Sequence, residues 1–186
     1  PASGLAAGPN FPTGAFFCAT LDLVAELAGS AAAPTLNLGM DAQPLRWTSE
    51  RELVSADGFT QVRLIAAGLE IQSRSLGFTA RFAALPAGDA RPSVAGRRFS
   101  SSLLQSAVEF AADGRTLCFS GPHGRSLTYP LRPLGGGLLA FDCPVALDEP
   151  PPGRFHLRLA GDGLRFGCLL AGGPALHFVE EKPALI

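Results

Sequence analysis

The chain has 186 residues, of which 47% are hydrophobic and 17% are charged, and its formal net charge is -1. A chain this apolar and this weakly charged lacks the composition of a disordered protein, and its near-neutral charge argues against a nucleic-acid-binding surface. Its length predicts a single domain with a sizeable core.

The apolar residues and the cysteines exclude two further classes. No long uninterrupted apolar run of transmembrane length occurs, so we expect no membrane insertion. The four cysteines form no Cys-x-x-Cys pair, so a zinc site is not expected. Each lies in a strand-like run, which favours isolated buried thiols over disulfides. These cysteines are Cys18, Cys118, Cys143 and Cys168.

The N-terminal part of the chain predicts an arm followed by strands. Residues 1–13 are rich in Ala, Gly and Pro and are predicted to form an arm or linker before a single β domain over residues 14–186. Apolar and polar residues alternate from Phe17 to Leu27, with Phe17 on the inward face, which predicts one long first strand. A second short strand is expected over residues 35–40.

The middle of the chain predicts a hairpin and one ambiguous segment. Alternation on either side of Gly68, over residues 61–72, predicts the hairpin, and Phe78 to Phe82 predict the next strand. Residues 86–98 form the longest polar stretch and are expected to be an exposed loop. Residues 101–112 fit either a helical turn after a serine cap or the start of a hairpin, and we expect one helical turn followed by a strand.

The C-terminal part of the chain predicts a turn and then several strands. Residues 121–124 are a turn signal, and strands are expected around Leu127 and Tyr129 and from Phe141 onward. Residues 155–168 alternate on both sides of Gly161-Asp162-Gly163, as a hairpin requires. A last strand is expected at Leu176 to Phe178.

These segments together predict an all-β fold. About nine to eleven short strands are separated by glycine- and proline-containing turns, and helices of the length that parallel crossovers need are not indicated. The spacing favours an antiparallel β-sandwich with at most one short helix, and an up-and-down β-barrel is the alternative. No internal repeat stands out.

The sequence carries no recognisable catalytic motif. It lacks Gly-x-Ser-x-Gly, P-loop and dinucleotide-binding patterns, and its His, Cys and carboxylate residues show no metal-ligand spacing, so no metal and no cofactor are expected. His156 and His177 fall on the polar faces of strands, where surface positions are expected. We therefore expect a non-enzymatic protein. The alternative is an enzyme built from dispersed residues, with His123 and either Asp142 or Asp162.

Two stretches carry a family resemblance. Gly8-Pro9-Asn10-Phe11-Pro12, followed by Ala19 to Val24 and by Gly29-Ser30, resembles the entry to an adenovirus fibre head. Leu176-His177-Phe178-Val179-Glu180 is similar to the last strand of that family. The resemblance covers about a fifth of the chain, and the family's Thr-Leu-Trp-Thr junction is absent. It implies an antiparallel sandwich, a homotrimer, attachment to a receptor through surface loops, and a place on the virion surface.

The leading functional hypothesis is a self-associating structural or attachment protein of a viral or phage surface. It would bind a host receptor or a neighbouring capsid protein, and a trimer is favoured. A small-molecule carrier built as a β-barrel is the alternative. The receptor-binding residues are expected on the long polar loop and the following turn, where function often lies. They are Arg91, Arg97, Arg98, His123 and Arg125.

Overall fold

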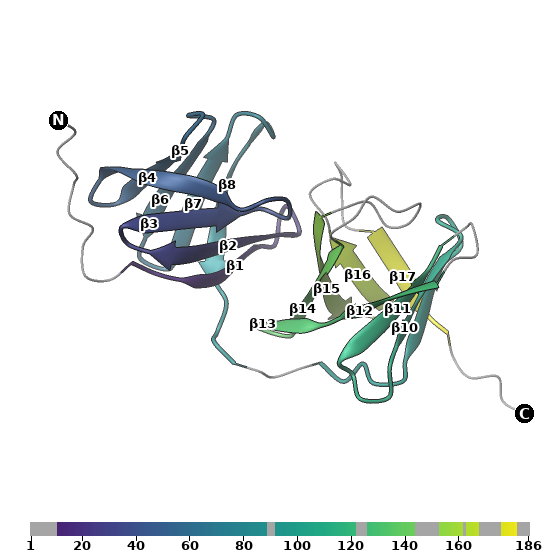
Figure 1. The fold of residues 1–186 in the computed structure, drawn as a ribbon. Helices are drawn as coiled ribbons and strands as arrows, with labels where there is room; N and C mark the ends of the chain where they lie inside the picture. Colours follow the sequence, from purple (N-terminus) through teal and green to yellow (C-terminus); the bar gives the residue numbers. More distant parts are fainter. Residues whose placement is uncertain are drawn as a thin grey trace, which may run out of the picture. The chain divides into compact units, whose positions relative to one another are not determined.

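A computed structural model describes residues 11–88, 92–121, 126–143, 153–161, 163–167 and 176–181. Every regular element in these ranges is a β-strand, so the all-β expectation is confirmed. The described residues accordingly include no helix that is long and apolar enough to cross a membrane. The chain divides into two compact units, Pro1–Leu85 and Pro86–Ile186, which Figure 1 shows in purple to teal and in teal to yellow.

The first unit is a closed barrel of eight antiparallel strands. Each strand pairs with the next one along the chain, and β8 pairs back with β1 to close the barrel (Figure 1). The strands are β1 (Gly14–Cys18), β2 (Leu23–Ser30), β3 (Ala33–Asn37), β4 (Gln43–Ser49), β5 (Glu52–Ser55), β6 (Thr60–Ile65), β7 (Gly68–Ser73) and β8 (Phe78–Ala84).

The interior of this barrel is lined by one side-chain set from each strand. Leu69 and Ile71 on β7 are fully buried, and Phe82 on β8 is 1% exposed, because alternate residues of each strand point inward. Cross-strand pairing places Leu69 opposite Phe82 and Ile71 opposite Val62, so the inward residues meet in layers. Eight strands leave an interior that side chains can fill or that can hold one small ligand.

The second unit is a single sheet of nine antiparallel strands. Its order is β12-β11-β10-β9-β17-β16-β15-β14-β13, and β12 also contacts β14, so the sheet curls round on itself. The strands are β9 (Arg98–Ser101), β10 (Ser106–Phe110), β11 (Thr116–Ser120), β12 (Ser126–Pro130), β13 (Arg132–Gly135), β14 (Leu138–Cys143), β15 (Gly153–Ala160), β16 (Gly163–Gly167) and β17 (Leu176–Glu180).

Aromatic side chains dominate the core of the second unit. The Phe141 ring stacks on Phe155 with centroids 5.0 Å apart, and Phe166 lies 5.6 Å from Phe141 and 5.6 Å from Phe178. All four rings are at most 3% exposed. Such ring pairs add to the hydrophobic contribution of the buried area.

The two units share one pairing scheme. In the first unit, β4 pairs with β3 through Gln43 and Pro44 and with β5 from Leu45 onward, apart from the bulged Thr48. In the second unit, β12 pairs with β11 and β13 pairs with β14, with only Leu131 between them. Strands β12 and β13 therefore take the place of β4, and every other ladder of one unit has its counterpart in the other, including closure of the last strand on the first.

The equivalence extends to individual residues at the hairpins. In the β6–β7 hairpin, Val62 is opposite Ile71 and Ile65 is opposite Gly68. In the β15–β16 hairpin, Leu157 is opposite Phe166 and Ala160 is opposite Gly163, with the same spacing. A Cβ atom on Gly68 would overlap the carbonyl oxygen of Phe82, and one on Gly163 would overlap that of Phe178.

Two irregular features also recur. A bulge falls between Trp47 and Ser49 in the β4–β5 ladder and between Pro133 and Gly135 in the β13–β14 ladder. The turn into the second strand of each unit ends on a non-glycine residue of positive φ, Asp22 at 47° and Gln105 at 49°. Because bulges and positive-φ positions are specific local devices, their recurrence identifies an internal repeat, contrary to the sequence expectation.

The structure corrects several finer expectations. The described residues form seventeen strands, and the first unit is an up-and-down barrel, the architecture expected only as the alternative to a sandwich. The expected first strand is two strands, β1 and β2, separated by a turn over residues 19–22, and this turn reverses the phase so that Phe16 and Cys18 point inward instead of Phe17. The single domain expected over residues 14–186 stays a prediction. Contacts within the chain divide it into two units after Leu85.

Two local expectations are also wrong. Residues 102–105 form a turn before β10, and no helical turn occurs there, because the backbone reverses to pair β10 with β9. His156 lies in the interior at 4% exposure and not at the surface, although its strand position alternates with core residues. The hairpin expected around Gly68 and the strand from Phe78 to Phe82 are confirmed.

Candidate functional site

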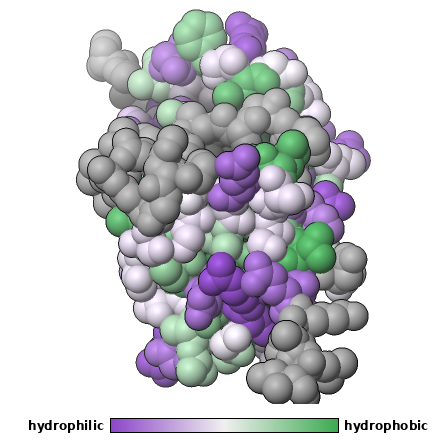
Figure 2. Space-filling model, turned by 90° about the vertical axis from the view of Figure 1, so that its right-hand side faces the viewer, coloured by the Kyte–Doolittle hydropathy of each residue, from purple (hydrophilic) through white to green (hydrophobic). Residues whose placement is uncertain are grey.

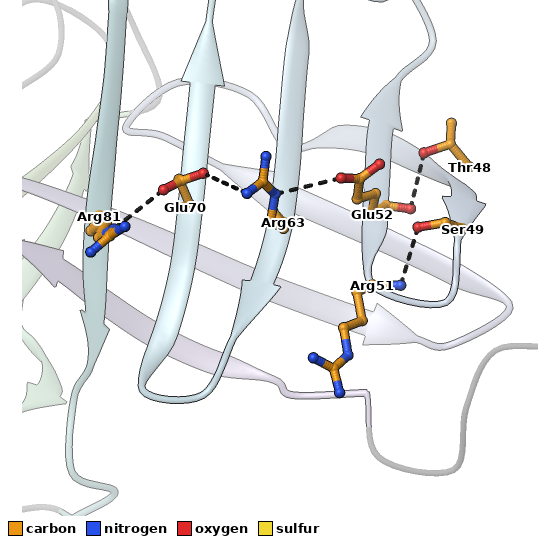
Figure 3. Close-up of polar contacts among 7 residues, drawn as sticks. All are labelled: Thr48, Ser49, Arg51, Glu52, Arg63, Glu70 and Arg81. Atoms are coloured by element: carbon orange, nitrogen blue, oxygen red, sulfur yellow. Dashed lines mark hydrogen bonds and ion pairs between the residues drawn. The ribbon is translucent and has the colours of Figure 1, made fainter.

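A row of four alternating charges crosses the outer face of the barrel. Glu52, Arg63, Glu70 and Arg81 lie directly opposite one another on β5, β6, β7 and β8 (Figure 3). Arg63 approaches Glu52 at 3.5 Å and Glu70 at 3.3 Å, and Arg81 approaches Glu70 at 3.2 Å. Exposed pairs of this kind each contribute little to stability. Their main consequence is that the row is neutral and its side chains are held in place.

A hollow of about 530 Å³ opens beside this charge row. Its other border is a second row of cross-strand neighbours, which on β5 to β8 lies two residues from the charge row. This row consists of Arg46 on β4, Val54 on β5, Gln61 on β6, Gln72 on β7 and Thr79 on β8. Val54 is 7% exposed and forms an apolar floor, whereas the polar side chains around it are exposed. The volume is in the range of small-molecule sites.

A separate feature lies at one end of the same barrel. In an up-and-down barrel, the turns that follow odd-numbered strands all lie at one end. Each of these four turns carries one exposed large apolar residue, and we call this set the apolar rim: Leu21 (38% exposed), Met40 (48%), Phe59 (51%) and Leu76 (42%). The turns at the opposite end, at residues 31–32, 50–51 and 66–67, carry none.

The turns of the apolar rim are held by side-chain hydrogen bonds. The backbone N–H of Gly39 donates to Asn37 Oδ1 at 2.7 Å, and that of Phe59 donates to Asp57 Oδ1 at 2.9 Å. The backbone N–H of Leu76 donates to Ser73 Oγ at 3.3 Å. These Asx- and Ser-type bonds fix the turn backbone. The apolar side chains are therefore presented from ordered turns.

The apolar rim differs from the rest of the exposed apolar surface. In the described part of the second unit, the exposed large hydrophobic residues are Leu103 and Val179, which lie on different elements. On the face drawn in Figure 2, strongly hydrophobic residues form separate green areas among purple and white ones. Isolated exposed apolar residues are ordinary, whereas a set gathered at one end indicates an interaction surface.

Two of the arginines expected to bind a receptor are engaged in ion pairs. Arg97 makes a bidentate pair with Glu180, at 2.7 and 2.6 Å, and its guanidinium lies 5.0 Å from the Phe99 ring centroid. Arg98 bonds to Glu181 at 2.8 Å and to Glu109 at 3.0 Å. Both therefore tie the end of the chain to β9 and β10. The other three expected residues, Arg91, His123 and Arg125, lie outside the described residues.

Of the residues named for a dispersed enzymatic site, Asp142 alone lies within the described ranges. Asp142 pairs with Arg154, with Nε 2.5 Å from Oδ1, while His123 and Asp162 lie outside the described ranges. Among the described residues, no group of three or more His, Cys, Asp or Glu side chains has the arrangement of a metal site. Cys18, Cys118 and Cys143 form no disulfide, and Cys168 lies outside the described part.

No family model matches the chain, and no curated protein matches it.

Sequence reasoning missed both the hollow and the apolar rim. Each rim residue is next to a residue typical of turns, such as Asp22 after Leu21 or Gly77 after Leu76. Because every second turn of an up-and-down barrel lies at the same end, this pattern could have placed the four residues together. The hollow depends on the register of five strands, which the sequence does not specify.

Proposed function

We propose that the protein is a non-enzymatic structural or attachment protein that self-associates through the apolar rim. The observation that carries this proposal is the placement of Leu21, Met40, Phe59 and Leu76 at one end of the barrel. Ordered turns reduce the entropy that association would otherwise cost. A trimer on a viral or phage surface, bound to a receptor or a neighbouring capsid protein, is the form that the fibre-head resemblance favours.

The strength of the contact follows from the exposed area. Full burial of a Leu, Met or Phe side chain contributes about 1.5–3 kcal/mol, and these four are roughly half exposed, so each adds about 1 kcal/mol. The rim as a whole then supplies about 4 kcal/mol. Loss of one anchor should weaken association by about fivefold, since 1.4 kcal/mol corresponds to a factor of ten.

Light scattering behind a sizing column tests this proposal over a range of protein concentrations. The native chain should give a mass above 19.3 kDa that rises with concentration. Phe59→Ser and Leu76→Ser should shift the equilibrium toward monomer, and the double variant should do so further. Leu103→Ser is the matched control, because Leu103 is 89% exposed but lies in the second unit. A native chain that stays monomeric at every concentration would overturn the proposal.

A second function is a small-molecule carrier, which the closure of the first unit into an eight-stranded barrel favours. Ala25 and Ala80 are small inward residues, and Ser55, Thr60 and Ser73 are buried polar residues at the end of the interior that faces the apolar rim. Such an interior could hold one small apolar ligand with a polar end. Quenching of Trp47 fluorescence by a long-chain fatty acid would support it, and an unchanged spectrum at saturating ligand would exclude it.

A further inference from the structure

The hollow on the outer face of β4–β8 has the features of a ligand site that is independent of self-association. Its two rows run parallel, because Glu52 and Val54, Arg63 and Gln61, and Glu70 and Gln72 are each two residues apart on one strand. Side chains two residues apart lie on the same face of a strand. The hollow is therefore lined by two adjacent rows of one continuous surface, one row charged and one row polar.

One cation of the hollow stands outside the ion pairs of the charge row, although the lining as a whole is balanced, with Arg46 and Arg63 against Glu52 and Glu70. In the charge row, the two arginines and two glutamates form a continuous chain of ion pairs, so this row is neutral. Arg46 adds one positive charge, and it makes no ion pair with any described residue. A guanidinium presents several N–H groups in a planar fork, which matches the two oxygens of a carboxylate.

The remaining polar groups of the hollow are also available for a ligand. Gln61, Gln72 and Thr79 are exposed, and their side chains make no hydrogen bond within the described part of the chain. Two amides and one hydroxyl can each donate and accept, which suits hydroxyl groups of a ligand.

The second unit shows that the fold does not require this set of residues. At the equivalent positions of its sheet, Arg132 replaces Arg46, whereas Ala140 replaces Val54, His156 replaces Gln61 and Gly167 replaces Gln72. Ala140 and His156 are buried there. The arginine is thus common to both units, but the exposed amides beside it are particular to the first.

We propose that this hollow binds a small molecule that carries one carboxylate and several hydroxyl groups. Arg46 receives the carboxylate, Gln61, Gln72 and Thr79 bind the hydroxyls, and Val54 contacts the carbon skeleton. The ligand class follows from the Arg46 guanidinium, which makes no ion pair with any described residue, and from the neutral polar groups around it.

The test uses D-glucuronate as the probe, with D-glucose and acetate as the neutral and the charge-only comparisons. Backbone and side-chain amide signals of the full chain are followed by NMR. Glucuronate should shift the Gln61 and Gln72 side-chain signals saturably, with a dissociation constant of the order of millimolar. Glucose and acetate should bind at least about tenfold more weakly, because glucose lacks the carboxylate and acetate lacks the hydroxyl groups.

Matched variants separate a specific site from general surface charge. Arg46→Gln should weaken glucuronate binding about tenfold or more, since it removes a charge-assisted pair. Arg132→Gln removes the same charge from the equivalent position of the second unit and should leave binding unchanged. Absence of saturable shifts, equal binding of acetate, unchanged binding by Arg46→Gln, or equal loss in Arg132→Gln would each overturn the proposal. None of these outcomes bears on the oligomeric state.

Discussion

Gly68 provides a direct test of the close approach between β7 and β8. Its φ is +151°, and a Cβ atom there would overlap the backbone carbonyl oxygen of Phe82 on the neighbouring strand. We expect Gly68→Ala to lower the free energy of unfolding for two reasons. The backbone conformation is unfavourable for a residue with a Cβ, at about 1–3 kcal/mol. The overlap with a main-chain atom cannot be relieved by a rotamer change and adds about 1–3 kcal/mol.

The matched control is Gly77→Ala. Gly77 also has a positive φ, of +71°, but a Cβ atom there would meet nothing within 4 Å. Its substitution should therefore cost only about 1–2 kcal/mol, from the backbone alone. Comparison of the two variants isolates the contribution of the contact with Phe82.

Urea unfolding monitored by Trp47 fluorescence measures both variants. Trp47 is the only tryptophan in the chain and lies on β4, so it reports on the first unit. With a denaturant slope of about 1–3 kcal/mol per molar, Gly68→Ala should move the midpoint down by about 1–3 M. If both variants lose the same stability to within about 0.5 kcal/mol, the close approach is not what requires glycine at position 68.

Three further predictions concern the repeat and two titrating groups. Gly163→Ala should destabilise the second unit, because a Cβ atom at position 163 would overlap the Phe178 carbonyl oxygen. Unfolding of this unit can be followed by the fluorescence of Tyr129, the only tyrosine of the chain. An unfolding midpoint equal to that of the native chain would contradict the prediction. Hydrogen bonds from the Ser55 hydroxyl and the Phe59 N–H lower the pKa of Asp57. This contribution to stability is therefore present above the unfolded pKa of about 3.9 and is lost as the pH falls through the folded pKa. In Ser55→Ala, carboxyl NMR should show a higher pKa for Asp57, and an unchanged one would refute the assignment. Burial, followed by the contact of its hydroxyl with Cys143 Sγ at 3.6 Å, raises the pKa of Tyr129. The stability that the neutral phenol contributes is thus complete below about pH 10 and declines as the pH rises further. Tyrosinate absorbance of the folded protein should therefore appear only well above pH 10. Titration of the folded protein near pH 10 would contradict this prediction.

The sequence alone determined the local β character of this protein. Alternation around Gly68 and from Phe78 to Phe82 correctly placed strands and their inward faces, because a period of two depends only on neighbouring residues. The same period misled at residues 17–27, because Phe17 on β1 and Ala19 and Leu21 in the turn are apolar at odd positions, whereas the inward residues of β1 are at even positions. Apolar residues in the turn and on the outer face can continue an alternation that the inward residues themselves do not follow.

The repeat was not apparent from the sequence because its two copies share few residue identities. Pro44-Leu45-Arg46 and Pro130-Leu131-Arg132 are the clearest match, and each proline lies opposite a threonine, Thr35 or Thr116. Elsewhere the copies share registers, a bulge and glycine positions while their side chains differ. Pairing geometry tolerates many apolar substitutions, so it persists where sequence similarity does not.

Only the tertiary structure decided where the candidate surfaces lie. The apolar rim joins Leu21, Met40, Phe59 and Leu76, which are separated along the chain by three strand pairs, and it exists because successive strands reverse direction. The polar hollow beside Arg46 exists because five strands align in one register. Closure of β8 on β1 and of β17 on β9 joins residues distant in the chain, and no local pattern encodes such contacts.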